Sequence, residues 1–185
     1  MTLTAPSRMT AEEFIAWAMN QPEGTHYELD DGEVVAMSPE RSAHSIVKVE
    51  VVFKLMGAIR AQGLPCDVYT DSMAVSVSAN TVYEPDIVVR CGKQLDGDVV
   101  LMLDPMVIME VLSPSTRSRD TTIKLVDYFR IPSLRHYVVL NAVKRTIVHH
   151  IRGDNGDILT RIIGDGVLRL DPPGITIDNL FPSRE

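Results

Sequence analysis

The feature that most constrains the fold is a continuous apolar run, MVIMEVL (106–112), that carries one glutamate, Glu110, in its middle. Continuous apolar character without polar alternation is typical of a strand covered on both faces. The run therefore predicts a strand inside a sheet that has helices on each side. An ionised carboxylate in such a strand is costly unless a cation accompanies it, so the fold must bring a metal ion or a basic side chain to Glu110.

The remaining pattern predicts a mixture of helices and strands. Thr10 and Glu13 form a capping box that predicts a short helix ending near residue 20. An Asp-Gly pair predicts the turn of a hairpin over residues 27–37. Further helices are expected over 42–61 and over about 118–130, the latter with Ser115 or Thr116 as its cap and with these candidate core residues: Ile123, Leu125, Val126, Tyr128 and Phe129. Strands are expected at 66–69, 73–77, 82–90 and 106–112 and in the later segments HYVVLNA, RTIVHHI, DILTRII and VLRL.

Length and composition favour one domain spanning residues 1–185, with a core over about 10–180, of the α/β (α+β) class with a mixed sheet. No segment approaches the roughly 18 uninterrupted apolar residues of a membrane span, and the N-terminus does not resemble a secretory signal. We therefore expect a cytoplasmic protein without a membrane partner, and Cys66 and Cys91 as reduced thiols. The net charge of −7 argues against nucleic-acid binding by bulk attraction, but it leaves room for a local basic groove.

Two carboxylates lie at or inside apolar strands, Asp86 in EPDIVV and Glu110 in VIMEVL. If these strands are neighbours, the two side chains converge, and such a pair either shares a proton or binds a metal ion. Oxygen ligands suit Mg²⁺ or Mn²⁺. Lys124, on the helix after Glu110, is placed to orient a water molecule or to stabilise charge on a phosphoryl oxygen. Together these residues describe metal-assisted phosphodiester hydrolysis.

The same residues carry a family resemblance. Pro85-Asp86 and Glu110, with YELDDGEVVAMSP upstream and EVLSPSTRSRDTTIKLVDY downstream, resemble the Uma-two restriction-endonuclease family of the PD-(D/E)xK nuclease superfamily. The resemblance covers residues 27–148 and continues loosely to Leu180. It implies a restriction-endonuclease-like mixed β-sheet flanked by helices, DNA as the partner, and Asp86 and Glu110 as ligands of Mg²⁺ or Mn²⁺.

One departure from the superfamily pattern affects the lysine. Leu112 occupies the position of the lysine in the ExK motif, so the resemblance makes Lys124 on the following helix its replacement. The resemblance also implies a glutamate ahead of the PD strand, for which we choose Glu28 over its rivals Glu33 and Glu50. The backbone carbonyl of Val111 is a further candidate metal ligand.

Three accessory candidates and their simpler explanations remain open. His44 follows MSPERSA, a segment similar to the family's pattern, although a capping or surface role is the simpler explanation. Tyr128 shares a helix face with Lys124, or else only packs in the core. Arg117 contacts phosphate, or else lies in a surface loop. Asp86 could instead be a residue at the start of a strand whose side chain accepts hydrogen bonds from local N–H groups. Glu110 could instead form an ion pair with Arg90.

These observations predict a Mg²⁺-dependent DNA endonuclease in which Asp86 and Glu110 hold the metal and Lys124 and Glu28 act beside it. A homodimer would provide two sites for two strands. A catalytically inactive binding or regulatory module with the same fold is the first alternative, and a metal-dependent phosphoesterase acting on a small substrate is the second.

Overall fold

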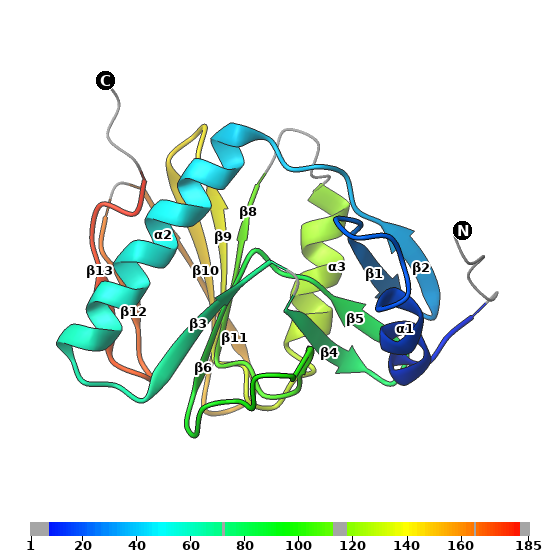
Figure 1. Cartoon of the computed structure of the whole chain (residues 1–185). Helices are drawn as coiled ribbons and strands as arrows, with labels where there is room; N and C mark the ends of the chain where they lie inside the picture. The colour runs from blue at the N-terminus through cyan, green and yellow to red at the C-terminus, as the bar shows by residue number, and fades with distance from the viewer. Residues whose placement is uncertain (1–7, 72, 113–117, 165, 182–185) are drawn as a thin grey trace.

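The structure is a computed structural model that describes residues 8–71, 73–112, 118–164 and 166–181. Within these ranges the helices are α1 (Ala11–Ala18), α2 (Ser42–Ala61) and α3 (Ser118–Tyr128). The strands, shown with the helices in Figure 1, are β1 (Tyr27–Asp30), β2 (Glu33–Ala36), β3 (Cys66–Thr70), β4 (Ala74–Ser78), β5 (Thr81–Tyr83), β6 (Ile87–Cys91), β7 (Leu101–Met102), β8 (Val107–Val111), β9 (His136–Asn141), β10 (Thr146–Arg152), β11 (Ile158–Ile163), β12 (Leu168–Leu170) and β13 (Ile175–Ile177).

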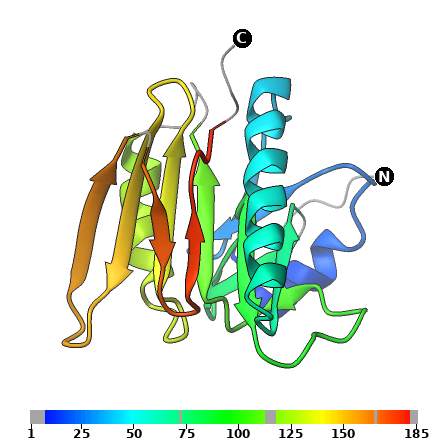
Figure 2. The ribbon, with the colours of Figure 1, turned by 90° about the vertical axis from the view of Figure 1, so that its left-hand side faces the viewer.

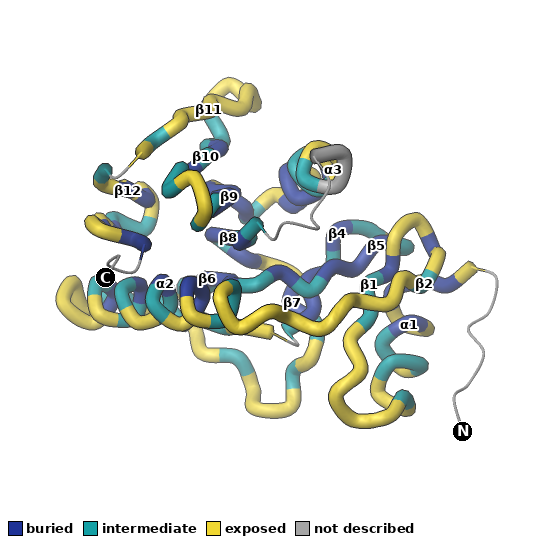
Figure 3. Tube along the Cα trace, turned by 90° about the horizontal axis from the view of Figure 1, so that it is seen from above, coloured by how far each residue is buried: buried dark blue, intermediate teal, exposed yellow. Residues whose placement is uncertain are grey.

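A six-stranded mixed sheet forms the centre of the molecule, in the order β11-β10-β9-β8-β6-β3. Strand β8 pairs antiparallel with β6 and parallel with β9, and α3 makes the crossover that a parallel pair requires. Figure 3 shows α2 on one face of this sheet and α3 on the other. The predicted α+β class, with a mixed sheet flanked by helices, is confirmed.

The alternation of side chains along β8 decides which helix each residue meets. Val107, Met109 and Val111 pack in the core cluster that includes α2, whereas Ile108 packs in the cluster that includes Tyr128 of α3. Because side chains alternate between the faces of a strand, Glu110 shares the α3 side with Ile108. The apolar run therefore belongs to a strand covered on both faces, as predicted, and its glutamate is directed toward α3.

Helix α2 has the predicted bounds but buries only part of its apolar surface. Val47, Val51, Leu55 and Ile59, spaced by four residues, are buried against the sheet and against β12 and β13. An equally apolar stripe made of Ile46, Val49 and Phe53 is exposed. The helix is apolar on two sides, so periodicity alone does not identify the side that packs.

The N-terminal segments form a second sheet, in the order β2-β1-β5-β4-β7, with α1 packed on it. The predicted capping box is present, since the Glu13 amide donates to Thr10 Oγ1 and the Thr10 amide donates to Glu13 Oε2. The predicted hairpin is also present, and its turn residues Asp31 and Gly32 have φ values of 47° and 84°. Two consecutive positive φ values are typical of the tight turn that an Asp-Gly pair favours.

One prediction about α3 needs correction, and one strand in the second half of the chain was missed. Ile123 and Val126 are not core residues, because α3 directs them to solvent. The helix cap predicted at Ser115 or Thr116 lies outside the described residues. Strand β13, which pairs with β12 beside α2 (Figure 2), was not predicted, because its three residues ITI follow the proline pair of DPPG and are too short to show a period.

The cysteine prediction is wrong, because Cys66 and Cys91 form a disulfide. They are 25 residues apart in sequence, but they lie opposite each other in the register of β3 and β6. Spacing along the chain does not show such a cross-strand pairing. Among the described residues, no helix is long and apolar enough to span a membrane.

A buried pair of histidines joins the sheet to the β12–β13 hairpin. His136 Nε2 lies 2.8 Å from the carbonyl oxygen of Pro172, and His136 Nδ1 lies 2.9 Å from His149 Nε2. Since His136 Nε2 must donate to the carbonyl, Nδ1 of a neutral His136 accepts and His149 Nε2 donates. Burial lowers the pKa of His136 and lowers that of His149 to about 3, with the neighbouring His136 adding to the effect. The lowered pKa values favour the neutral form of both rings, and the two contacts are consistent with it.

Acidification is therefore expected to destabilise the protein through this pair. In the unfolded chain a histidine binds a proton below its ordinary pKa of about 6.5, whereas folded His149 does not, so the stabilisation present above that pH is lost as the pH falls toward 3. The loss from His149 at about pH 5 is on the order of 2 kcal/mol. Urea unfolding at about pH 7.5 and pH 5 measures it. His149→Gln keeps a donor toward His136 but does not titrate, so it is expected to reduce the loss of stability at low pH. His26→Gln, which replaces an exposed histidine, is the control and is expected to leave that loss unchanged. Equal losses in both variants would contradict the prediction.

Candidate active site

The candidate residues meet at one end of the six-stranded sheet, where β8 ends, β6 begins and the first turn of α2 lies nearby (Figure 1). Ile87 of β6 is paired with Met109 of β8 in an antiparallel register. The next residues outward are Asp86 and Glu110, which brings the two carboxylates to neighbouring strand ends. The strands that carry Asp86 and Glu110 are therefore neighbours, which is the condition under which the sequence predicted that the two carboxylates converge.

Lys124 joins two glutamates that are far apart in sequence. Its Nζ atom lies 2.9 Å from Glu28 Oε1 on β1 and 3.3 Å from Glu110 Oε1 on β8. All three side chains are largely buried, with 12–15% of their surface exposed. The Lys124 ammonium also lies 5.0 Å from the centre of the Tyr83 ring, within the range of a cation–π contact. Lys124 is therefore a cation that accompanies Glu110.

The surroundings of Glu110 favour its protonated form in the absence of a metal. Burial raises the pKa of Glu110 to about 7, and the nearby Asp86 and Glu28 carboxylates add to the increase, while Lys124 and the Tyr128 hydroxyl oppose it. A divalent cation would reverse this balance, because it favours the carboxylate. Carboxylates with a raised pKa in a partly buried cluster are frequent at metal and catalytic sites.

Tyr128 holds Glu110 in place. Its fully buried hydroxyl donates to Glu110 Oε1 over 2.9 Å. We expect Tyr128→Phe to lower the free energy of unfolding by only about 1 kcal/mol, because one hydrogen bond is lost without loss of packing. The phosphodiester hydrolysis that the sequence predicts should fall by about tenfold, because Glu110 loses its orientation. Urea unfolding and single-turnover cleavage measure the two effects; Tyr69→Phe on β3 is the control, and unchanged cleavage by Tyr128→Phe would exclude a positioning role.

Asp86 connects β8 to α2. Its Oδ2 accepts from the amide of Val111 over 2.7 Å, and its Oδ1 lies 3.0 Å from His44 Nε2. The Asp86 carboxylate raises the pKa of His44 above its ordinary value, against the opposing effect of burial. The structure thus adds His44, an accessory candidate, to the immediate surroundings of Asp86. The role of the Val111 carbonyl as a ligand stays a prediction.

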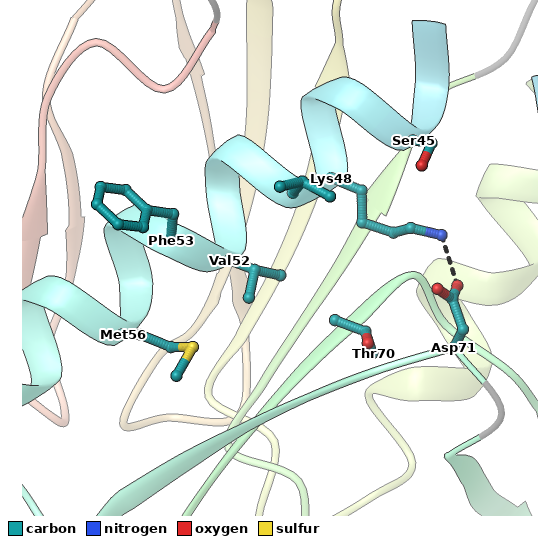
Figure 4. A pocket seen from close by; sticks show the side chains of 8 residues that line it. Ser45, Lys48, Val52, Phe53, Met56, Thr70 and Asp71 are labelled. Atoms are coloured by element: carbon teal, nitrogen blue, oxygen red, sulfur yellow. Dashed lines mark hydrogen bonds and ion pairs between the residues drawn. The ribbon is translucent and has the colours of Figure 1, made fainter. Parts of the chain in front are cut away.

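A second lysine lies beside this pair. The Nζ atom of Lys48, one turn after His44 on α2, is 2.6 Å from Glu40 Oε1 and 2.5 Å from Asp71 Oδ1. Figure 4 shows Lys48 reaching from α2 to Asp71 at the end of a groove between α2 and β3 that is lined by both apolar side chains, such as Val52 and Met56, and the polar Ser45 and Thr70. Glu40 Oε1 also lies 3.4 Å from His44 Nε2. Two lysines therefore flank the carboxylates, one from each helix.

Several sequence alternatives are now decided by position. Glu50 pairs with Lys54 on α2, and Glu33 is an exposed residue of β2, so Glu28 is the glutamate that lies beside Lys124. Arg90 pairs with Asp104 and not with Glu110. Arg117 lies outside the described residues.

Sequence reasoning missed three polar residues at the site, namely Glu40, Lys48 and Glu84. Glu84 donates its amide to Glu28 Oε1 over 3.1 Å and thereby fixes the carboxylate that holds Lys124. A signal for the first two exists, because Glu40, His44 and Lys48 follow one another at intervals of four residues. Glu40 precedes α2, but this spacing still brings its side chain to the helix face that carries His44 and Lys48. No comparable pattern marks Glu84.

Comparison with known proteins places this arrangement in a family. Residues 11–178 match the model of the Uma2 family, whose description is "putative restriction endonuclease". An uncharacterized protein of Synechocystis sp. is 26% identical over 153 residues, which cover 82% of this chain and 78% of that protein. The crystal structure of a protein from Anabaena variabilis, described as a putative nuclease belonging to DUF820, superposes with a TM-score of 0.75 at 15% identity, covering 94% of this chain and 97% of the other. The fold is thus shared with a solved structure, and the chain belongs to the Uma2 family.

Proposed function

We propose that the protein is a metal-dependent endonuclease that hydrolyses phosphodiester bonds of DNA. The observation that carries the proposal is the position of Lys124, whose ammonium reaches Glu110 and Glu28 from α3 although the lysine position on the strand is occupied by Leu112. Membership in a family described as restriction endonucleases supports nuclease activity in general.

The donor set fits a hard divalent cation such as Mg²⁺ or Mn²⁺. Asp86 and Glu110 would hold it, since they offer carboxylate oxygens at adjacent strand ends and the burial of Glu110 is unfavourable for an unpaired charge. A bound cation would supply Lewis-acid polarisation of the phosphoryl group and a more acidic water molecule. The carbonyl of Val111 is proposed as a further ligand.

The protein's own groups would orient and stabilise the reacting phosphodiester. The Lys124 ammonium, held by Glu28, would donate a hydrogen bond to the phosphoryl oxygen on which negative charge develops. Tyr128 and the amide of Glu84 keep the Glu110 and Glu28 carboxylates in fixed positions, so little reorganisation is needed during the reaction. His44 holds Asp86 from α2, and Arg117 is proposed to contact phosphate.

Substrate and assembly complete the proposal. A homodimer would place two such sites on the two strands of a duplex. The net charge of −7 gives weight to a small phosphate ester as the alternative substrate, because such an enzyme needs no broad basic surface. Sedimentation equilibrium of the full chain tests the dimer.

The function is tested by offering the full chain supercoiled plasmid, single-stranded DNA, RNA and bis(p-nitrophenyl) phosphate with Mg²⁺, with Mn²⁺ or with EDTA. Metal-dependent nicking of the plasmid that EDTA abolishes is the expected result. Turnover of the small ester alone would favour the phosphoesterase. Salt-sensitive DNA binding without turnover of any substrate would favour the inactive binding module.

A further inference from the structure

The first turn of α2 carries a histidine whose buried nitrogen faces two carboxylates. His44 Nε2 lies 3.0 Å from Asp86 Oδ1 and 3.4 Å from Glu40 Oε1, and the three side chains offer ligand atoms that all lie within 4.8 Å of one another. Nε2 is buried and makes no hydrogen bond of good geometry among the described residues, although Asp86 Oδ1 lies at ion-pair distance. A shared metal ion is one partner that would use the lone pair of Nε2 and both carboxylates.

The separations between these atoms suit a shared metal ion. Ligands at right angles around an ion, each at about 2.1 Å, are about 3.0 Å apart. The His44–Asp86 separation of 3.0 Å agrees with this value, and the His44–Glu40 separation of 3.4 Å is within reach of a small side-chain adjustment. The two separations from His44 Nε2 thus resemble those between neighbouring ligands of one ion.

The charged side chains around His44 carry an excess of negative charge. The carboxylates of Glu40, Asp71 and Asp86 surround one ammonium, that of Lys48. Lys48 compensates one of the three negative charges, and two remain when His44 is neutral. A divalent cation would neutralise them.

We propose that His44 and Glu40 join Asp86 as ligands of the metal centre, and that the imidazole makes this centre prefer Mn²⁺ to Mg²⁺. The inference rests on the proposed function only for Asp86 as a metal ligand. Mg²⁺ favours an all-oxygen shell and gives up its water slowly, whereas later first-row ions accept imidazole readily. A mixed nitrogen and oxygen set therefore shifts selectivity toward Mn²⁺.

The test is Mn²⁺ binding to the full chain, measured by electron paramagnetic resonance titration with Mg²⁺ as competitor. Pulsed measurements on the same samples detect the ¹⁴N coupling of a coordinated imidazole. The wild type is expected to bind Mn²⁺ at least about tenfold more tightly than Mg²⁺ and to show this coupling. His44→Gln is expected to weaken Mn²⁺ binding by at least about tenfold, to change Mg²⁺ binding little and to remove the ¹⁴N coupling. Glu40→Gln is expected to weaken Mn²⁺ binding and to retain the ¹⁴N coupling.

Matched controls exist for both substitutions. His26→Gln removes an exposed imidazole that lies 3.0 Å from Glu84, and Glu50→Gln removes a carboxylate of α2 that pairs with Lys54. Neither should change Mn²⁺ affinity. If His44→Gln does not fold, the wild-type protein is labelled with ¹⁵N-histidine instead. If a histidine coordinates the Mn²⁺ ion, the coupling must then change from ¹⁴N to ¹⁵N.

The outcomes separate this inference from the nuclease proposal. Absence of Mn²⁺ binding, Mn²⁺ bound without nitrogen coupling, or unchanged affinity in a folded His44→Gln variant would overturn the inference. Such a result would leave the nuclease proposal standing if metal-dependent plasmid nicking is observed. Conversely, His44-dependent Mn²⁺ binding without cleavage would support the metal site and overturn the nuclease.

Discussion

Asp86→Asn is expected to reduce metal-dependent DNA cleavage by about 10²–10³-fold while the protein stays folded. The asparagine keeps an oxygen that accepts the Val111 amide, so the link between Asp86 and β8 survives. It removes the negative charge that lies between Glu110 and His44. The loss of cleavage would therefore reflect weaker metal binding and not a changed fold.

The measurement is the single-turnover rate of plasmid nicking as a function of Mn²⁺ concentration, with the thermal midpoint of each variant as the test of folding. Asp104→Asn is the matched control, because it removes an aspartate from an exposed ion pair with Arg90. It is expected to cleave like the wild type. Equal rates for Asp86→Asn and Asp104→Asn would show that Asp86 is not a metal ligand.

Lys124→Met should impair both cleavage and stability. Without the ammonium, the largely buried Glu28 and Glu110 carboxylates face each other unpaired, which we expect to lower the free energy of unfolding by about 2–3 kcal/mol. Cleavage should fall by about 10²-fold, because the variant lacks the ammonium that we propose stabilises the phosphoryl oxygen. Lys124→Arg keeps the charge and is expected to recover stability more fully than cleavage, since the guanidinium is larger and differently shaped.

The stability loss in Lys124→Met should depend on pH in a defined direction. The pKa of Glu110 is about 7 with Lys124 present, and loss of the ammonium raises it further. A carboxyl whose folded pKa is raised contributes stability at low pH that is lost as the pH rises through that pKa. The deficit relative to the wild type, measured by urea unfolding of the metal-free protein, should therefore be larger at about pH 8 than at about pH 6. A deficit that shrinks over this range would contradict the role of Lys124 beside Glu110.

The strands and helices that shape the site could be predicted because their signals are local. The MVIMEVL run predicted β8, the Asp-Gly pair predicted the β1–β2 turn, and the capping box predicted α1. Each signal depends on residues within a few positions of one another. The division of the strands between a six-stranded and a five-stranded sheet was not predicted, since it depends on pairings between distant segments.

The contacts of the site were predictable only in part, for the same reason. The resemblance indicated Asp86, Glu110, Lys124 and Glu28, and the structure brings their elements together. It could not show that Lys124 bridges two glutamates, because β1 and α3 are about a hundred residues apart and meet only in the folded chain. The pairing of Cys66 with Cys91 depends on the register of β3 and β6, which no spacing reveals.

Buried polar groups elsewhere show how function and packing use the same residue types. His149 and His150 are adjacent, but His149 contacts His136 while His150 stacks on Tyr137, so the two rings lie on opposite faces of β10. Neither contributes to the candidate site. His44, in the first turn of α2, instead lies beside the Asp86 and Glu40 carboxylates of the site.

The most direct test of the central claim is the fraction of supercoiled plasmid nicked by the wild type and by Glu110→Gln, each with Mn²⁺ and with EDTA. Glutamine keeps an oxygen that accepts from Tyr128 and Lys124, so the variant isolates the charge of Glu110. The account predicts nicking by the wild type with Mn²⁺ only, and none by Glu110→Gln in either condition. Nicking by Glu110→Gln at the wild-type rate, or wild-type nicking that persists in EDTA, would contradict it.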